Sequence, residues 1–256
     1  MAARPPADDA AAATDAATDT GATTPAATDT AAGALAAADA ATAQPRTVTP
    51  SPCWSSPRAA RFKRLLDVAV SATALAVLAP LLVVIAVAVK RDSDGPALYV
   101  DWRVGRGGRL FRCFKFRTMV ADAAARQCAL EGVNECGGVL FKIRDDPRVT
   151  RAGRWLRRYS LDELPQLVNV LRGDMSLVGP RPLPTRDVSL MEDWHLQRHL
   201  VSPGLTGLWQ VNGRSRLDFD DMIRLDLDYI EDWRPGHDLA ILARTVRCVL
   251  GADGAY

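Results

Sequence analysis

The sequence has few of the residues that metal and redox sites require. It contains five cysteines and three histidines among 256 residues. There is no Cys-x-x-Cys pair and the cysteine number is odd, which argues against a disulfide framework or a zinc knuckle and favours reduced thiols. His195 and His199 have helical spacing, but the glutamate that follows the first histidine in zinc proteases is missing. We expect both to be surface or phosphate-adjacent groups, not metal ligands.

The first 60 residues lack large apolar side chains and consist mostly of Ala, Thr, Asp, Pro and Ser. Such a segment cannot bury enough apolar surface to offset the entropy lost on ordering. It also lacks the basic start, apolar middle and small-residue cleavage site of a secretory signal. We predict a disordered polar tail over residues 1–60, a membrane-inserted helix over 61–92 and a folded domain over 93–256.

Nucleotide-binding fingerprints are absent too. There is no Walker motif, and Gly105-Arg106-Gly107-Gly108 does not open a helix as a Rossmann motif would. Residues 61–256 carry 29 basic and 24 acidic side chains. This weak excess, with no aromatic-basic module, argues against a nucleic-acid partner.

One long apolar run is present. Residues 68–89 contain no charged side chain, and at about 1.5 Å per residue they could just cross a hydrocarbon core of about 30 Å. Pro80 would bend a helix near its middle. Basic residues flank both ends, which the positive-inside rule places on the cytoplasmic side: Arg61, Lys63, Arg64, Lys90 and Arg91. A re-entrant helix bent at Pro80 and a kinked spanning helix are both open, with a buried core helix less favoured.

Short elements are predicted after this run. Alternating apolar residues on both sides of Gly105–Gly108 predict a β-hairpin that carries Lys115 and Arg117 at its far end, where two cations would suit an anionic ligand. Charge that blunts an edge strand is the alternative. Helices are predicted over 121–130, 152–159, 164–171, 191–200, 219–233 and 239–250, the last capped by Asp238. The expected fold class is α+β, mostly helical.

Two adjacent carboxylates, Asp162 and Glu163, follow a run of arginines (151, 154, 157 and 158). Ser160 and Glu163 have the spacing of a capping box, so one interpretation is that the pair only starts a helix. The other interpretation is phosphoryl chemistry, because a carboxylate can attack phosphorus and nearby arginines favour its ionised form. One acid could be a nucleophile and the other a Mg²⁺ ligand or a positioning acid.

Arg181 is framed by two prolines, Pro180 and Pro182, which hold its backbone away from the helical region. An arginine presented in one place suits two phosphate oxygens. A membrane-anchored scaffold whose arginines hold anionic lipid headgroups is the rival interpretation.

A series of ungapped motifs resembles those of the bacterial sugar transferases, the monotopic polyprenyl-phosphate phosphoglycosyl transferases. The resemblance covers about residues 61–256. The motifs are Lys115–Met119, Ser160–Leu167, Asn169–Ser176, Gly179–Pro182, Pro203–Gly207 and Gln210–Arg214.

The resemblance implies transfer of a sugar 1-phosphate, glucose or galactose, from a UDP-sugar to undecaprenyl phosphate. UMP would be released through a covalent phospho-sugar enzyme, with Mg²⁺ as cofactor. Asp162 would be the nucleophile and Glu163 would lie at the metal. The other positions that match residues binding phosphate or shaping the site are Lys115, Arg157, Arg181, Arg214 and Asp238.

The resemblance also implies a re-entrant membrane helix bent at Pro80 and a catalytic domain on the cytoplasmic face of the inner membrane. The reaction would be the first membrane step of exopolysaccharide, capsule or O-antigen synthesis, with downstream glycosyltransferases as partners; a homodimer is compatible with it. Two positions depart from the family pattern: Ala79 precedes the proline where serine is frequent, and Asp101 stands where glutamine is frequent.

Overall fold

The computed structural model describes residues 47–130, 132, 139–140, 143, 145–213 and 217–251. Most of the predicted polar tail, residues 1–46, therefore lies outside the described residues. The remaining part of it, residues 47–60, is packed, so the predicted boundary at residue 60 is too late. Val48 is buried, and the ring of Trp54 stacks on Trp233 with centroids 4.1 Å apart. The few large side chains of this stretch, which includes the 3-10 helix η1 (Pro52–Ser55), fix it to the domain.

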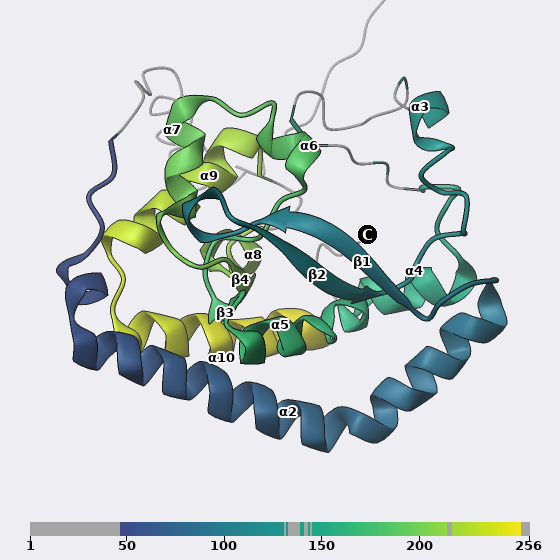
Figure 1. Ribbon diagram of the computed structural model, residues 1–256, viewed down its shortest axis with the longest axis horizontal. Helices are drawn as coiled ribbons and strands as arrows, with labels where there is room; N and C mark the ends of the chain where they lie inside the picture. Colours follow the sequence, from purple (N-terminus) through teal and green to yellow (C-terminus); the bar gives the residue numbers. More distant parts are fainter. Residues whose placement is uncertain are drawn as a thin grey trace, which may run out of the picture. The chain divides into compact units, whose positions relative to one another are not determined.

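The apolar run forms most of α2 (Pro57–Asp92), a helix of 36 residues. The Ser56 hydroxyl accepts from the Ala59 amide, and Pro57 occupies the first turn, where a missing N–H costs little. Pro80 lies inside the helix and removes one backbone hydrogen bond. Figure 1 shows α2 bending partway along, with both of its ends next to the other described elements. The structure thus has one continuous bent helix and not the two separate arms of a hairpin.

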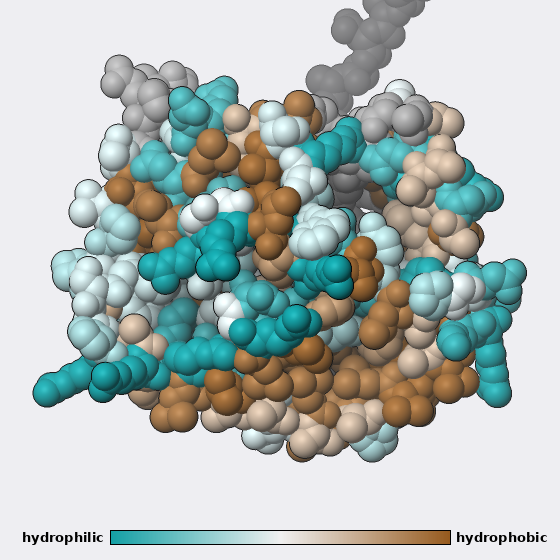
Figure 2. Space-filling view, viewed as in Figure 1, coloured by the Kyte–Doolittle hydropathy of each residue, from teal (hydrophilic) through white to brown (hydrophobic). Residues whose placement is uncertain are grey.

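Many large apolar side chains of α2 are exposed in the described structure. This helix is long and apolar enough to cross a membrane. Figure 2 shows hydrophobic side chains gathered over α2, with hydrophilic groups at both of its ends. The large exposed residues on it are Phe62, Leu65, Val68, Val70, Val77, Leu81, Val83, Val84 and Val87. The buried core helix considered from the sequence is therefore wrong for this segment.

The predicted β-hairpin is confirmed. Strands β1 (Leu98–Val104) and β2 (Leu110–Phe116) pair antiparallel, with Asp101 opposite Cys113. They are joined through the 3-10 turn η2 (Arg106–Gly108), where Gly107 has a φ of 63° that glycine adopts freely. One face of β2 is buried against the domain, whereas the outer face of β1 is exposed.

Four of the predicted helices are confirmed, with bounds that differ by a few residues. They are α4 (Arg151–Arg158), α5 (Gln166–Arg172), α9 (Phe219–Glu231) and α10 (Pro235–Gly251). Gly173, with a φ of 85°, ends α5 as a left-handed cap. The helix predicted over 121–130 is reduced to α3 (Gln127–Leu130), and the one predicted over 191–200 is divided into α7 (Asp193–Leu196) and the 3-10 helix η5 (Gln197–Leu200). The short helices η4 (Leu161–Glu163), α6 (Thr185–Val188) and α8 (Leu208–Val211) complete the described set.

A second small sheet passes through the centre of the domain. Strands β3 (Ser176–Val178) and β4 (Gly204–Thr206) are parallel. A Cβ atom added to Gly204 would collide with the backbone of Gly179, so glycine permits this close approach. The main core packs around this sheet and includes Cys113, Leu167, Val170, Met175, Leu177, Ile223, Leu227, Ile230, Trp233 and Ile241. A smaller cluster joins the second half of α2 to β2 and α4 through Ile85, Val89, Phe116 and Leu156.

Candidate active site

The two adjacent acids lie on a tight turn that a left-handed residue creates. Ser160 has a φ of 54° and is the one described non-glycine residue with a positive φ. Its carbonyl accepts from the Glu163 amide at 3.3 Å, but its side chain caps nothing, so the predicted capping box is wrong. The acids lie on η4, and successive side chains of a 3-10 turn point about 120° apart. The left-handed backbone costs about 1–2 kcal/mol, which the surrounding packing must offset.

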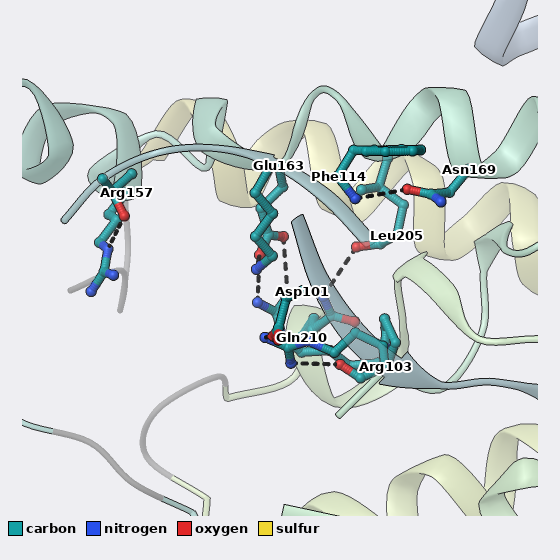
Figure 3. A network of polar contacts seen from close by, with 12 residues as sticks. Asp101, Arg103, Phe114, Arg157, Glu163, Asn169, Leu205 and Gln210 are labelled. Atoms are coloured by element: carbon teal, nitrogen blue, oxygen red, sulfur yellow. Dashed lines mark hydrogen bonds and ion pairs between the residues drawn. The ribbon is translucent and has the colours of Figure 1, made fainter. Parts of the chain in front are cut away.

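Glu163 is held by two cations. Lys115, from β2, places its Nζ 2.8 Å from Glu163 Oε1. The Arg181 guanidinium binds both carboxylate oxygens, Nη1 at 3.0 Å from Oε2 and Nη2 on Oε1. Burial opposes ionisation of Glu163, but the charges and hydrogen bonds of Arg181 and Lys115 outweigh it and hold the pKa well below its usual range. Glu163 is thus a fixed anion at the centre of the polar network in Figure 3.

Asp162 has the opposite environment. Its side chain is buried, and within the described ranges no donor is hydrogen-bonded to its carboxylate. Burial and the neighbouring Glu163 charge raise the pKa of Asp162, whereas Lys115, Arg157 and Arg181 oppose the rise. Among the described residues its oxygens carry no hydrogen bond and can meet a reacting atom, and the three cations offset part of the rise in its pKa.

Arg157 reaches the site from α4 on another side. Its Nε donates to the Thr118 hydroxyl at 3.0 Å, a contact shown to one side of Glu163 in Figure 3. A Cβ atom on Gly153 would collide with the Thr118 carbonyl, so this glycine lets α4 lie against the end of β2. Burial lowers the pKa of Arg157, and Asp162 is the first of the acids that oppose the change. Arg157 is therefore a cation fixed beside the free acid.

Two predicted ligand-binding residues point elsewhere. Arg117 is buried, and its Nη2 donates to the Ser93 carbonyl at 2.7 Å, in the turn that follows α2. Asp238 does not cap α10, which begins three residues earlier at Pro235. Its carboxylate instead accepts from Lys63 Nζ at 2.6 Å and from the Tyr229 hydroxyl at 2.8 Å. Both residues fix α2 to the domain in this structure and neither contacts Glu163.

Two further predictions have different outcomes. Arg214 lies outside the described residues. His195 is buried, where a surface or phosphate-adjacent position was expected. Its Nδ1 accepts from the Glu192 amide at 3.1 Å and its Nε2 lies 3.2 Å from Asp220 Oδ1. It closes the start of α7 and contacts no active-site residue in the described part of the chain.

Asn169 is a site-building residue to which the sequence assigned no role. Its Oδ1 accepts from the Phe114 amide at 3.0 Å, and its Nδ2 donates to the Arg112 carbonyl at 2.6 Å. These bonds fix β2 against α5 and so place Lys115 beside Glu163 (Figure 3). Its isolation among the apolar residues of α5 was the available signal, because a polar side chain at a core position needs partners.

The acids suit a cation that arrives with a phosphorylated ligand. No three His, Cys, Asp or Glu side chains gather among residues that the structure describes. Mg²⁺, however, usually takes only one or two protein carboxylates together with phosphate oxygens and water. Asp162 and Glu163 fit this requirement, although Glu163 would have to share oxygens with Lys115 and Arg181.

The sequence matches the family described as bacterial sugar transferase over residues 58–252. A relative from Salmonella typhimurium, undecaprenyl-phosphate galactose phosphotransferase, is 43% identical over 204 residues, which are 78% of this chain and 43% of the relative. A relative from Caulobacter vibrioides, UDP-glucose:undecaprenyl-phosphate glucose-1-phosphate transferase, is 45% identical over 202 residues, 76% of this chain and 72% of the relative. Exopolysaccharide production protein ExoY of Rhizobium meliloti is 37% identical over 198 residues, 76% of this chain and 88% of the relative. The chain spans less than half the length of the Salmonella relative.

Proposed function

Because the chain belongs to the bacterial sugar transferase family, we propose that it transfers a sugar 1-phosphate from a UDP-sugar to undecaprenyl phosphate and releases UMP. The names of the Caulobacter and Salmonella relatives support glucose or galactose as the sugar. The observation that carries the proposal is the contrast between the two acids. Asp162 is buried with no hydrogen bond to its oxygens from any residue that the structure describes, and Glu163 beside it is held ionised by Lys115 and Arg181.

In the proposed first step, an Asp162 oxygen attacks the sugar-bearing phosphorus of the donor. A carboxylate–phosphorus bond forms, the bond to the UMP oxygen breaks, and UMP leaves with the electron pair. In the second step, a phosphate oxygen of undecaprenyl phosphate attacks the same phosphorus. The lipid-linked diphosphate forms and Asp162 leaves as a carboxylate. All attacking and leaving groups are anions, so neither step requires a general base.

The cations would neutralise the charge that this chemistry brings together. Phosphoryl transfer depends mainly on positioning and electrostatic stabilisation. Lys115 and Arg181 lie on Glu163, and Arg157 approaches from α4. On donor binding, all three have N–H groups to offer to the diphosphate. Arg214 is a further proposed phosphate contact.

We also propose Mg²⁺ as the cofactor, held by Glu163 and the diphosphate of the donor. When bound, it would supply positive charge to the phosphate oxygens. The orientation of Glu163 by Lys115 and Arg181 comes from the protein itself.

The membrane segment is proposed to be re-entrant, with the catalytic residues on the cytoplasmic face of the inner membrane. Both ends of α2 lie next to the other described elements (Figure 1), and both ends carry basic side chains. Helices α4, α5 and α10 contact α2 and each exposes a large apolar side chain: Trp155, Val168 and Val246. A lipid surface that receives α2 would also cover these residues.

The decisive experiment compares Asp162→Asn with Asp193→Asn, which alters an exposed carboxylate. UMP release from a UDP-sugar and undecaprenyl phosphate is measured in vesicles. We expect Asp162→Asn to lose more than about 1,000-fold in rate, because amides are poor nucleophiles toward phosphorus, and the control to remain within about twofold. Retained turnover in Asp162→Asn would exclude the nucleophile assignment.

The sugar is tested with a panel of UDP-sugars scored for UMP release. We expect UDP-glucose or UDP-galactose to give the highest kcat/KM. A preference for an N-acetylated sugar would contradict this assignment and leave the reaction type unchanged. The lipid-linked product would then be the substrate of glycosyltransferases acting later in exopolysaccharide, capsule or O-antigen synthesis.

A further inference from the structure

The segment that presents Arg181 is short of hydrogen-bond donors. Prolines occupy positions 180, 182 and 184, and proline has no backbone N–H. Three of the five backbone N–H groups are therefore missing from Pro180–Pro184. Such a segment can be held mainly through its carbonyl oxygens.

The four carbonyls of residues 180–183 each accept one hydrogen bond from another part of the fold, and the donors come from three elements, β4, η5 and β1. The Pro180 carbonyl accepts from the Gly204 amide at 2.8 Å, and the Leu183 carbonyl from the Val104 amide at 3.2 Å. The two central carbonyls accept from guanidinium groups. Arg198 Nη2 lies 2.8 Å from the Arg181 carbonyl, and Arg103 Nη1 lies 3.1 Å from the Pro182 carbonyl.

Arg198 differs from Arg103 because it is fully buried. It lies on η5, and its Nε and Nη2 bind Asp226 Oδ2 of α9 at 3.1 and 2.5 Å. The two side chains are 2% and 1% exposed. Arg198 Nη1 has no hydrogen-bond partner among the described residues. Burial also raises the pKa of Asp226 to about 6, against the opposing charge of Arg198.

Such a pair is an expensive way to stabilise a core. Apolar side chains of similar volume are often as stable as a buried ion pair or more stable. A role beyond stability is therefore needed to account for it, and among the described residues the one side-chain hydrogen bond that Arg198 makes outside the pair is to the Arg181 carbonyl. On the other side of that residue, the Arg181 guanidinium holds both oxygens of Glu163.

We propose that Arg198, with Asp226 as its counter-ion, is a positioning residue for the transferase reaction. It fixes the backbone of Arg181 and thereby aims the guanidinium at Glu163 and at the diphosphate of the donor. The inference rests on the proposed function and adds a residue that touches neither substrate.

The test replaces the buried pair by apolar groups in the full chain, as Arg198→Met with Asp226→Leu. We expect the midpoint of thermal unfolding in detergent to equal or exceed the wild-type value. We expect kcat to be roughly 10- to 100-fold below the wild-type value, which is the effect of losing a hydrogen bond from a charged donor. KM for the UDP-sugar should change much less than kcat, because the lost effect concerns orientation. Recovery of kcat together with stability would overturn the proposal.

Arg198→Lys provides a second variant that retains the charge beside Asp226. A single ammonium cannot reproduce the planar fork that reaches both Asp226 and the Arg181 carbonyl. We therefore expect a folded protein with lowered kcat, and a wild-type kcat would contradict the role. Arg224→Met, which removes a partly exposed arginine paired with Asp221 on α9, is the matched control and should keep kcat within about twofold.

A double-mutant cycle shows whether Arg198 acts through Arg181. The variant with both Arg181→Met and Arg198→Met should have a kcat within about twofold of that of Arg181→Met alone, because the guanidinium that Arg198 positions is already absent. Fully additive losses would overturn the proposal. A wild-type chain that releases no UMP from any UDP-sugar would instead refute the transferase function, so the two failures are distinguishable.

Discussion

At the scale of single residues, the site separates two neighbouring acids by what binds them. Glu163 has salt bridges to Lys115 and Arg181, and its pKa is held low. Asp162 is buried without such a bond in the described structure, and its pKa is raised. Burying Asp162 without such a partner destabilises the fold, as expected where a group must react and not only support the fold.

The raised pKa of Asp162 predicts how stability changes with pH. A carboxyl group whose folded pKa is raised favours folding below its unfolded pKa, near 3.9, and this contribution is lost as pH rises through the folded value. Asp162→Asn should therefore be more stable than the wild type at pH 8, and the difference should shrink toward pH 4. Thermal melts in detergent across this range measure it, with Asp193→Asn as the control. A wild type that is the more stable form at pH 8 would contradict the prediction.

The sequence indicates which charged residues form the site, but it does not indicate how they are arranged. The arginine run, the acid pair and the proline-framed Arg181 were visible as patterns, and the structure brings Lys115, Glu163 and Arg181 together. The left-handed Ser160 was not predictable, because serine has no local preference for that backbone and tertiary packing imposes it.

At the scale of elements, α2 and the hairpin follow from simple patterns. Alternation gave the β1–β2 pairing because one face of β2 is buried. The length of α2 followed from its apolar run, and its bend from Pro80. The short helices were less predictable, since α7 and η5 contain too few turns for a clear period.

The re-entrant proposal predicts that both ends of α2 face the same compartment. Ser55→Cys and Asp94→Cys are made singly in a chain whose five native cysteines are replaced by alanine. Both new thiols should react with a membrane-impermeant maleimide from the cytoplasmic side, because exposed polar ends remain in water. Val77→Cys, in the exposed apolar part of α2, is the control and should stay unlabelled. Labelling of Ser55→Cys and Asp94→Cys from opposite sides would establish a spanning helix.

At the scale of the domain, one buried cluster joins α2 to β3 and the segment that carries Arg181. Lys63 donates to the Val178 carbonyl at 3.0 Å and to Asp238 at 2.6 Å. One turn further along α2, Asp67 accepts from the Ser176 hydroxyl and the Leu177 amide. All three residues of β3 are thus bonded to α2, and β3 leads directly into the segment that carries Arg181.

Removing one partner of this cluster should destabilise the whole domain. Lys63→Met would leave Asp238 buried without its cation, at a cost of roughly 3–5 kcal/mol. We expect a large fall in the thermal midpoint while membrane association persists, because the apolar face of α2 is intact. Lys63→Met with Asp238→Asn should recover most of the loss, and Lys90→Met, at the exposed end of α2, should be nearly neutral. An unchanged midpoint in Lys63→Met would refute this role.

This cluster marks the limit of prediction from the sequence. Lys63 was read as an interfacial cation and Asp238 as a helix cap, both of which are local interpretations. Their actual contact joins positions 175 residues apart. Local spacing contains no information about such a pairing, which depends on how α2, α9 and α10 pack.

The segment before α2, residues 47–56, packs on the domain, and this limits how far the chain can be shortened. Ser51 donates to the Trp233 carbonyl at 2.9 Å, and Trp54 lies on the ring of the same residue. A fragment that starts at the apolar helix would expose this ring and lose the backbone bond to Ile230. The shortest fragment worth expressing therefore begins before Val48, and purification tags belong ahead of that point, not directly at Pro57.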